Sequence, residues 1–317
     1  YQGVDIMKFR QSLLLSSIAL LGLPLGLAQS VQGQGFQAGM PLGAVNEGGE
    51  RVPMSDNVKV YGGFHFTESC TFDPARNLIL AMNAGGPGDG TENDGHVSLI
   101  HPDGSVHTPK WIGQTRDGLE LHHPLGSAIQ GDVLYTVDTG HLRRFNLQTG
   151  QPMRSIAVPG STILNGIGVA EDGTAYISNT RAPESIYKVT ASGEVSVFAE
   201  GAPLAAPNGV AIDPDGNVVV VNINDNNVIT YDTDGDVLRI EQAVEGGNDG
   251  LVILDDGTKY VSSVRFGSVS RIRSGEEAEI IAEGIPSAAS MCYDSTQHQL
   301  VIPMNPNYSL AFVPLDD

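Results

Sequence analysis

The feature that most constrains the fold of this chain is a unit of about 40 residues that recurs between residues 64 and 317. In each unit a short apolar strand is followed by a turn, a second strand, a loop, a third strand, a glycine turn and a fourth strand. The unit that opens at Asn208 shows this most clearly, with turns at 213–216 and 233–235. Its Asp-Gly pairs supply the positive φ that tight hairpins need. Repeated four-stranded antiparallel units of this length indicate the blades of a β-propeller, packed around a central channel.

Six blades are predicted, and the sixth is incomplete because the chain ends after its third strand, 309–313. Residues 57–62 resemble the outer strands at 195–201 and 279–284, so we expect them to complete the last blade. The prediction is an all-β, six-bladed propeller whose ring is closed by an N-terminal strand, which leaves no exposed sheet edge at the seam. The blades are expected to open near Glu68, Leu125, Asn165, Asn208, Asp249 and Ala289.

The N-terminal part of the chain reads as an export signal followed by a leader. Met7 to Arg10 form a positive segment, residues 12–27 are apolar, and Gly26-Leu27-Ala28 is a small-residue cleavage site. We therefore divide the chain into upstream residues and a secretory signal (1–28), a flexible leader (29–50) and one propeller domain (51–317). The alternative to a cleaved signal is a retained membrane anchor, although Pro24 interrupts the apolar run. The expected location is secreted or periplasmic.

Charge and cysteine content narrow the class of protein further. Asp and Glu number 37 against 17 Lys and Arg, a formal net charge of −20. This balance opposes binding to nucleic acid or to anionic membranes. The two cysteines, Cys70 and Cys292, cannot build a disulfide framework. Both fall in apolar strand patterns, so we expect buried free thiols, with a bridge as the alternative.

Oxygen-bearing side chains stand at the opening of four innermost strands. Asn165, Asn208 and Asp249 are separated by 43 and 41 residues, and Glu68 has the same offset in the first unit. Equivalent positions of every blade meet at one mouth of the channel, so these four side chains should converge. Four oxygens that include two carboxylates fit Ca²⁺ better than Mg²⁺, and another divalent cation is the alternative. Asn-Gly before a strand is also simply a turn signal.

The mouth that carries this set should also carry the substrate contacts. The second strand of each blade runs back to the same mouth, and its last residues include Asn83, Asn179 and Asn222. His123 and Arg265 fall in loops that face this mouth. We predict that these five side chains bind substrate, with ordinary surface roles as the alternative. The loop 84–96 is a candidate lid or specificity wall, or else a surface loop.

The chain resembles the senescence marker protein/gluconolactonase/regucalcin family of six-bladed propellers, and is similar also to diisopropylfluorophosphatase and the paraoxonases. The resemblance covers residues 57–317 and rests on the Glu68, Asn165, Asn208 and Asp249 set with the Pro-Asn-Gly-Val-Ala-Ile-Asp-Pro-Asp-Gly run at 207–216. It implies one catalytic Ca²⁺ held by the four residues, and hydrolysis of lactones, related esters or phosphotriesters. Asp249 matches the family's metal-bound acid, a general base or nucleophile. Ile163 departs from the Arg that sugar-lactonase members often carry there.

The function expected from the sequence is therefore an exported calcium-dependent hydrolase of the lactonase or esterase type, acting on a small-molecule lactone or ester. Asp249 is the first candidate for the catalytic group and Glu68 the second. The chain has no Gly-x-Ser-x-Gly elbow, no P-loop and no dinucleotide fingerprint. The main alternative is a non-enzymatic binding or scaffold propeller with a structural calcium. A third is an enzyme of the strictosidine-synthase type that uses the same pocket for non-hydrolytic chemistry.

Overall fold

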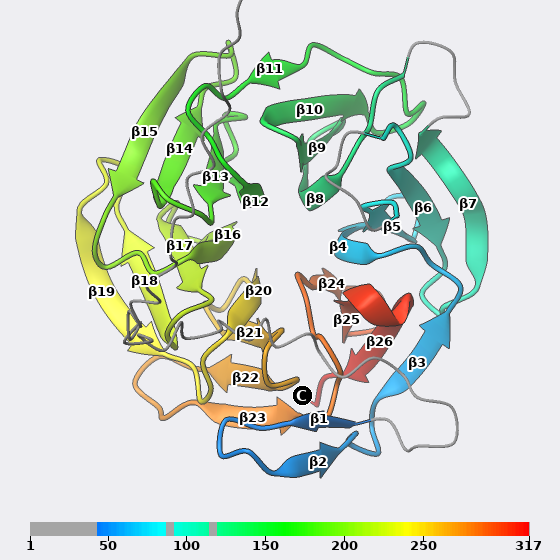
Figure 1. The fold of residues 1–317 in the computed structure, drawn as a ribbon, viewed down its shortest axis with the longest axis vertical. Helices are drawn as coiled ribbons and strands as arrows, with labels where there is room; N and C mark the ends of the chain where they lie inside the picture. Colours follow the sequence, from blue (N-terminus) through cyan, green and yellow to red (C-terminus); the bar gives the residue numbers. More distant parts are fainter. Residues whose placement is uncertain (1–42, 87–91, 114–118, 317) are drawn as a thin grey trace, which may run out of the picture. The chain divides into compact units, whose positions relative to one another are not determined.

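The computed structural model describes residues 43–86, 92–113 and 119–316, so the predicted signal, most of the leader and the centre of the 84–96 loop lie outside the described residues. The described part forms six four-stranded antiparallel sheets and one short hairpin. Seen along the shortest axis, the six sheets form a ring with one strand of each nearest the centre (Figure 1). The predicted six-bladed, all-β propeller is confirmed.

Each blade takes its strands in chain order from the centre outwards. The first three blades are β4 (Thr67–Asp73), β5 (Leu78–Asn83), β6 (His96–Ile100) and β7 (Val106–Gly113); β8 (Pro124–Gln130), β9 (Val133–Asp138), β10 (His141–Asn146) and β11 (Ile156–Ala157); β12 (Leu164–Val169), β13 (Ala175–Asn179), β14 (Ser185–Val189) and β15 (Val195–Glu200). The next two are β16 (Pro207–Ile212), β17 (Val218–Asn222), β18 (Asn227–Tyr231) and β19 (Val237–Gln242); β20 (Asn248–Ile253), β21 (Lys259–Ser263), β22 (Val269–Ile272) and β23 (Glu279–Ala282).

The sixth blade joins the two ends of the described chain. It consists of β24 (Cys292–Asp294), β25 (Gln299–Met304), β26 (Ser309–Pro314) and β3 (Lys59–Gly62). β3 runs antiparallel to β26, with Ser309 opposite Gly62 and Phe312 opposite Lys59. The strand expected at 57–62 is thus found at 59–62, on the outer edge of the blade that lacked one.

The core lies between the faces of neighbouring blades. All five residues of β17 are buried, whereas five of the six residues of β19 are exposed. A middle strand is covered by a blade on each face, so its residues are apolar without alternation. The outer strand faces solvent and tolerates charge. This difference explains why the sequence shows short apolar runs rather than a period-two pattern.

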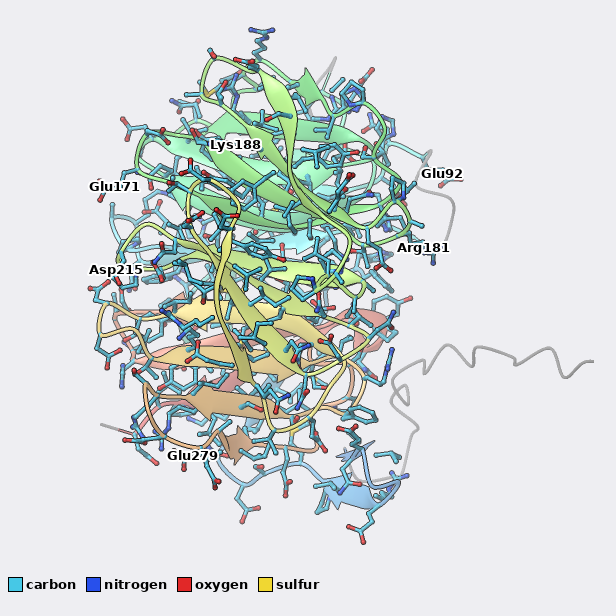
Figure 2. The ribbon with its side chains drawn as sticks, turned by 90° about the vertical axis from the view of Figure 1, so that its left-hand side faces the viewer. Glu92, Glu171, Arg181, Lys188, Asp215 and Glu279 are labelled. Atoms are coloured by element: carbon cyan, nitrogen blue, oxygen red, sulfur yellow. A yellow bond between two sulfur atoms is a disulfide. The ribbon has the colours of Figure 1, made fainter. Side chains whose placement is uncertain are left out.

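Turns of the predicted type hold the inner hairpins. Gly216 has φ of 85° and its N–H donates to the carbonyl of Asp213 at 2.9 Å. Figure 2 shows the consequence from the side: Glu171 and Asp215, from turns between the first and second strands, lie on one face. Arg181 and Glu92, from loops between the second and third strands, lie on the opposite face. The two mouths of the channel are therefore built from different loops.

The first described residues are part of the folded ring. β1 (Gly43–Val45) and β2 (Arg51–Pro53) form a hairpin. Its turn contacts the loop between β19 and β20: the N–H of Glu47 donates to Glu245 Oε1 at 3.0 Å, and the N–H of Gly246 donates to Glu47 Oε2 at 3.3 Å. The hairpin spans residue 50, where the sequence placed the boundary between leader and propeller. Among the described residues no helix has the length and hydropathy needed to cross a membrane.

The expectation of free thiols is wrong. Cys70 on β4 and Cys292 on β24 form a disulfide, with their Cα atoms 5.4 Å apart and 222 residues apart in the chain. The sequence separation hides the physical reason: ring closure places the inner strands of blades one and six side by side, with Ser69 bridged to Ser290. The bond therefore spans the seam of the ring.

Replacing both cysteines by alanine is expected to destabilise the protein by about 3–5 kcal/mol, because a cross-link over so long a loop restricts the unfolded chain strongly. Thermal unfolding should show a melting temperature lower by roughly 10 °C. A reductant should lower the melting temperature of the wild type by a similar amount and leave the variant unchanged. A wild-type protein indifferent to reductant would contradict the role of this bond.

Candidate metal centre

The four predicted ligands all occupy bulges in innermost strands. Each is the second residue of its strand, within it rather than just ahead of it as the sequence suggested. The strand pairing shifts register at these places, as between Leu164 and Ile167 and between Pro207 and Val210. The same shift occurs around Glu68 and Asp249. A bulge re-aims a side chain relative to the regular pleat, so one local irregularity recurs in every blade that supplies a ligand.

The glycines after these residues have a role that differs from the turn signal they suggest. Gly166, Gly209 and Gly250 do not have positive φ. A Cβ on Gly166 would lie 2.1 Å from the carbonyl oxygen of Asn208, and one on Gly209 would lie 2.4 Å from that of Asp249. Each glycine lets the next inner strand approach its backbone closely. The Asn-Gly and Asp-Gly pairs are therefore packing positions that draw the ligand-bearing strands together, and the turn interpretation of these pairs is wrong.

The predicted set is brought together in the channel. Asn208 Nδ2 donates to Asp249 Oδ2 at 3.1 Å, across blades four and five. Glu68 is close enough to Asp249 for its charge to raise the pKa of that carboxyl. Exposed fractions are 6% for Glu68, 8% for Asn165, 2% for Asn208 and 3% for Asp249. Four oxygen-bearing groups are thus removed from water at one place.

Three buried oxygens of this set have no hydrogen-bond partner: Asn165 Oδ1, Asn208 Oδ1 and Asp249 Oδ1. They come from three consecutive blades. An unpaired buried acceptor costs about 1–3 kcal/mol, and more when it is charged, so a partner shared by the three would stabilise the folded chain. A hard divalent cation is a partner that accepts several oxygens at once. The donor set therefore fits calcium.

The pKa shifts of Glu68 and Asp249 also fit a cation at this place. Burial raises the pKa of Glu68, although the hydrogen bond from Asn305 and the nearby His123 oppose the effect. Burial and then the charge of Glu68 raise the pKa of Asp249 well above its ordinary value, with Asn208 opposing. Two acids that repel each other away from water favour either a proton or a cation.

The described residues contain no group of three or more His, Cys, Asp and Glu side chains that could hold a metal ion. The predicted set differs from such a group because two of its four members are amides. An O-only set with two carboxylates and two amides, and without thiolate or imidazole, is unlike a zinc site.

Metal-free protein is expected to lose stability as the pH rises. The raised pKa values of Glu68 and Asp249 favour the protonated acids in the folded state. Their contribution to the free energy of unfolding is therefore full below the pKa values of the unfolded chain, 4.5 and 3.8. It is lost as the pH rises through the pKa values of the folded state. Urea unfolding in a chelator between pH 4 and 8 measures this. The slope of the unfolding free energy against pH should be smaller in the Glu68→Gln/Asp249→Asn variant. An identical slope in the two proteins would contradict the role of these two acids.

One residue of the site was missed by sequence reasoning. Asn305 follows β25 in blade six and opens the short 3₁₀ helix η1 (Asn305–Asn307). Its Nδ2 donates to Glu68 Oε2 at 2.6 Å. Its place at the end of a second strand is the signal that could have found it, because other strand ends of this kind had been assigned to the mouth.

Three predicted substrate contacts have a different role. Asn83, Asn179 and Asn222 are completely buried. Asn179 Oδ1 accepts the N–H groups of Thr162 and Ile163 at 2.7 and 3.0 Å. Asn83 does the same for His65, and Asn222 donates to the carbonyl of Pro203. These amides fix the loops that lead into the inner strands, so their assignment as substrate contacts is corrected.

His123 and Arg265 remain at the mouth. His123 is half-buried, its Nδ1 lies 2.8 Å from the carbonyl of Ala84, and it influences the pKa of Glu68. Because Nδ1 donates to that carbonyl, Nε2 is the nitrogen left for another partner. Arg265 lies on the rim, where one guanidinium nitrogen contacts Asn224 Oδ1 at 3.4 Å.

The residues two positions before the ligands form an uneven mouth. Phe66 and Ile163 are half-buried and pack against one apolar cluster, and the ring of Phe66 lies 6.4 Å from that of His123. On the other side the corresponding positions hold the small residues Ala206 and Gly247. The described mouth thus has an apolar and aromatic wall facing small side chains.

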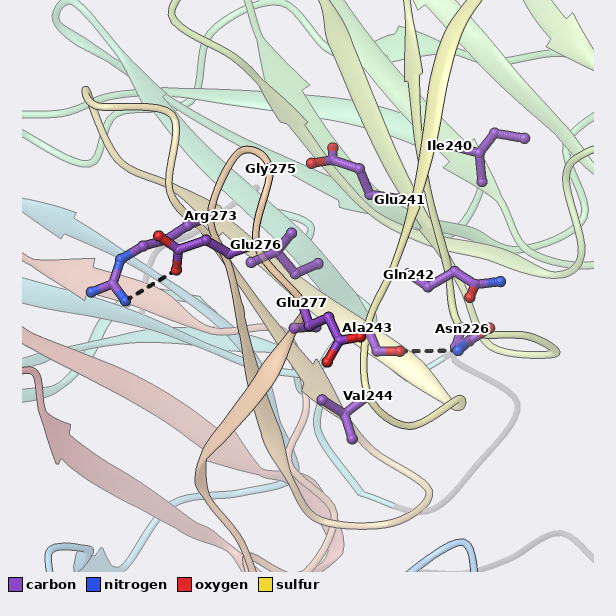
Figure 3. A pocket seen from close by; sticks show the side chains of 12 residues that line it. Asn226, Ile240, Glu241, Gln242, Ala243, Val244, Arg273, Gly275, Glu276 and Glu277 are labelled. Atoms are coloured by element: carbon purple, nitrogen blue, oxygen red, sulfur yellow. Dashed lines mark hydrogen bonds and ion pairs between the residues drawn. The ribbon is translucent and has the colours of Figure 1, made fainter.

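A pocket that does not belong to this centre lies at the periphery of blades four and five (Figure 3). Its polar groups pair locally: Asn226 Nδ2 donates to the carbonyl of Ala243 at 3.0 Å, and Arg273 lies 3.9 Å from Glu276. None of its lining residues is a predicted ligand. It adds nothing to the chemistry of the centre.

Residues 91–245 match the family model described as the SMP-30/Gluconolactonase/LRE-like region. The resemblance to this family is confirmed. The matched segment holds Asn165 and Asn208 and lies between the two carboxylates, Glu68 and Asp249. No curated protein matches the chain significantly.

Solved structures show the fold. A gluconolactonase from Xanthomonas campestris is 18% identical, covers 82% of this chain and 91% of its own, and has a TM-score of 0.60. A virginiamycin B lyase from Staphylococcus aureus is 14% identical, covers 82% of this chain and all of its own, and has a TM-score of 0.57. A Bacteroides thetaiotaomicron protein of unknown function is 14% identical, with coverage of 83% and 79% and a TM-score of 0.60. At such identities the likeness establishes architecture alone.

Proposed function

We propose that this protein is an exported, calcium-dependent hydrolase of lactones or related esters. The observation that carries the proposal is the group of three unpaired buried oxygens beside two buried carboxylates, at one mouth of a propeller of the gluconolactonase-like family. Glu68, Asn165, Asn208 and Asp249 would hold the ion. The disulfide supports export, because such bonds persist in oxidising compartments.

Bound calcium would polarise the carbonyl of the substrate and stabilise the negative charge that develops on its oxygen. Asp249 would take the proton of the attacking water on a carboxylate oxygen, or attack the carbonyl carbon itself. Its buried position excludes bulk water, and Asn208 orients the carboxylate by donating to Oδ2, which leaves Oδ1 for the ion. His123, whose Nδ1 donates to the carbonyl of Ala84, would present Nε2 to the substrate at the mouth.

The mouth favours an apolar substrate. Phe66 and Ile163 present carbon rather than hydrogen-bond donors beside the ligands. A polyhydroxylated sugar lactone would lose water there without gaining partners, whereas an alkyl or aryl group would gain buried area at about 25 cal/mol per Å².

A panel of lactones, with and without calcium, tests this proposal. Alkyl γ- and δ-lactones should be hydrolysed with kcat/KM at least about 10-fold above that of gluconolactone, a modest effect for one apolar wall. Phe66→Ala should raise KM for the alkyl substrates. Turnover of gluconolactone alone would overturn the substrate class. A stabilising calcium with no turnover of any lactone, ester or phosphotriester would favour a binding propeller instead.

A further inference from the structure

Blade six carries no ligand at the position equivalent to the others, where Ala289 stands, yet it reaches the centre by another route. Asn305 Nδ2 donates to Glu68 Oε2 at 2.6 Å, from blade six to blade one, and the two residues are 237 positions apart in the sequence. Both side chains are 6% exposed. When Glu68 is ionised, as in the proposed calcium centre, this is a charge-assisted hydrogen bond between buried groups, and such bonds are short and strong.

The orientation of the Asn305 amide is fixed from its other end. Ser287 Oγ donates to Asn305 Oδ1, and Ser287 is 4% exposed. The carboxylate of Glu68 can only accept, so the NH₂ group of Asn305 faces it and the amide oxygen is left to accept from Ser287. Ser287 has φ of 57°, in the left-handed region that serine seldom adopts. The backbone there places the hydroxyl at the amide.

The corresponding amides in other blades do not act in this way. Asn83 and Asn179 use their oxygens to hold the backbone of their own blade. Asn305 instead crosses the seam and contacts a ligand. Asn208 makes the matching contact with Asp249. Each carboxylate of the centre therefore receives one amide N–H from a neighbouring blade, and each keeps a second oxygen outside that bond.

We infer that Asn305, locked by Ser287, is a positioning residue that holds Glu68 with Oε1 available to the ion. The inference rests on the proposed calcium centre. Asn305 is neither a ligand nor a catalytic residue. It gives blade six, which supplies no ligand of its own, a role in metal affinity through two hydrogen bonds.

Calcium titration of the full chain by calorimetry tests the relay. Asn305→Leu keeps the volume and removes the donor, and should raise the dissociation constant about 10–100-fold, as loss of an orienting partner does. Ser287→Ala removes only the lock, worth one hydrogen bond, and should raise it about 5-fold. Because Ser287 acts only through Asn305, the double variant should match Asn305→Leu within about 2-fold.

Thr136→Val is the matched control. Thr136 is fully buried and donates to the carbonyl of Gly126 at 2.9 Å in blade two, which supplies no ligand. This variant should lose stability and keep the wild-type dissociation constant. If calcium binds the wild type and Asn305→Leu equally, the relay is wrong and the metal centre stands. If the effects of the two substitutions on the dissociation constant multiply in the double variant, Ser287 acts independently of Asn305 and the relay is wrong. If the wild type binds no calcium, the proposed centre fails and the relay with it.

Discussion

Asp249→Asn is expected to lower kcat of the lactonase reaction by at least about 10³-fold while the protein stays folded. The amide keeps the shape of the side chain but cannot take a proton or attack a carbonyl. It also removes one of only two negative charges in the predicted donor set, so calcium binding should weaken. Steady-state rates at saturating calcium, with circular dichroism of the same sample, measure this.

Asp256→Asn is the control for that substitution. Asp256 lies in the same blade, in the turn between β20 and β21 at the other end of these strands. Its Oδ1 accepts the N–H of Thr258 at 2.8 Å. An asparagine keeps this acceptor, so rates should be unchanged. An Asp249→Asn enzyme with wild-type kcat would remove Asp249 from catalysis and would leave Glu68 as the candidate base.

Removing calcium is expected to abolish hydrolysis and to lower the melting temperature. An ion that binds only the folded state stabilises it by about 2.7 kcal/mol when its concentration is 100 times the dissociation constant. For a domain of this size the melting temperature should rise by roughly 5–10 °C. The physical reason is local: without the ion, three buried oxygens lack a partner and two buried acids repel each other.

Differential scanning calorimetry in chelator, and again after calcium is restored, measures this effect. Glu68→Gln should make the melting temperature nearly insensitive to chelator, since a carboxylate that needs the ion is gone. Activity and melting temperature that both survive complete chelation would contradict a metal centre. Loss of stability with no activity to lose would favour the scaffold alternative.

The repeat made the blades predictable. Turn residues and apolar strands are local signals, so six units and their order were readable without a structure. The in-phase Glu68, Asn165, Asn208 and Asp249 followed from symmetry alone, since equivalent positions on a ring must meet. The closing strand was found because β3 has the composition of an outer strand.

What escaped prediction depends on contacts across the ring. Cys70 and Cys292 are neighbours only after closure, and their strand patterns read as core. Asn305 stands at the end of a second strand, which places it at the mouth, but its contact with Glu68 forms only when blade six packs against blade one. Asn179 looked like a mouth residue because the strand ends there. Its side chain turns to the backbone of its own blade instead.

Anomalous diffraction from crystals grown with calcium, or with a lanthanide in its place, would locate the ion. One peak is expected in the channel, about 2.3–2.6 Å from oxygens of Glu68, Asn165, Asn208 and Asp249. Crystals that hold the ion elsewhere, or hold none while those four side chains keep their places, would contradict the proposed calcium centre.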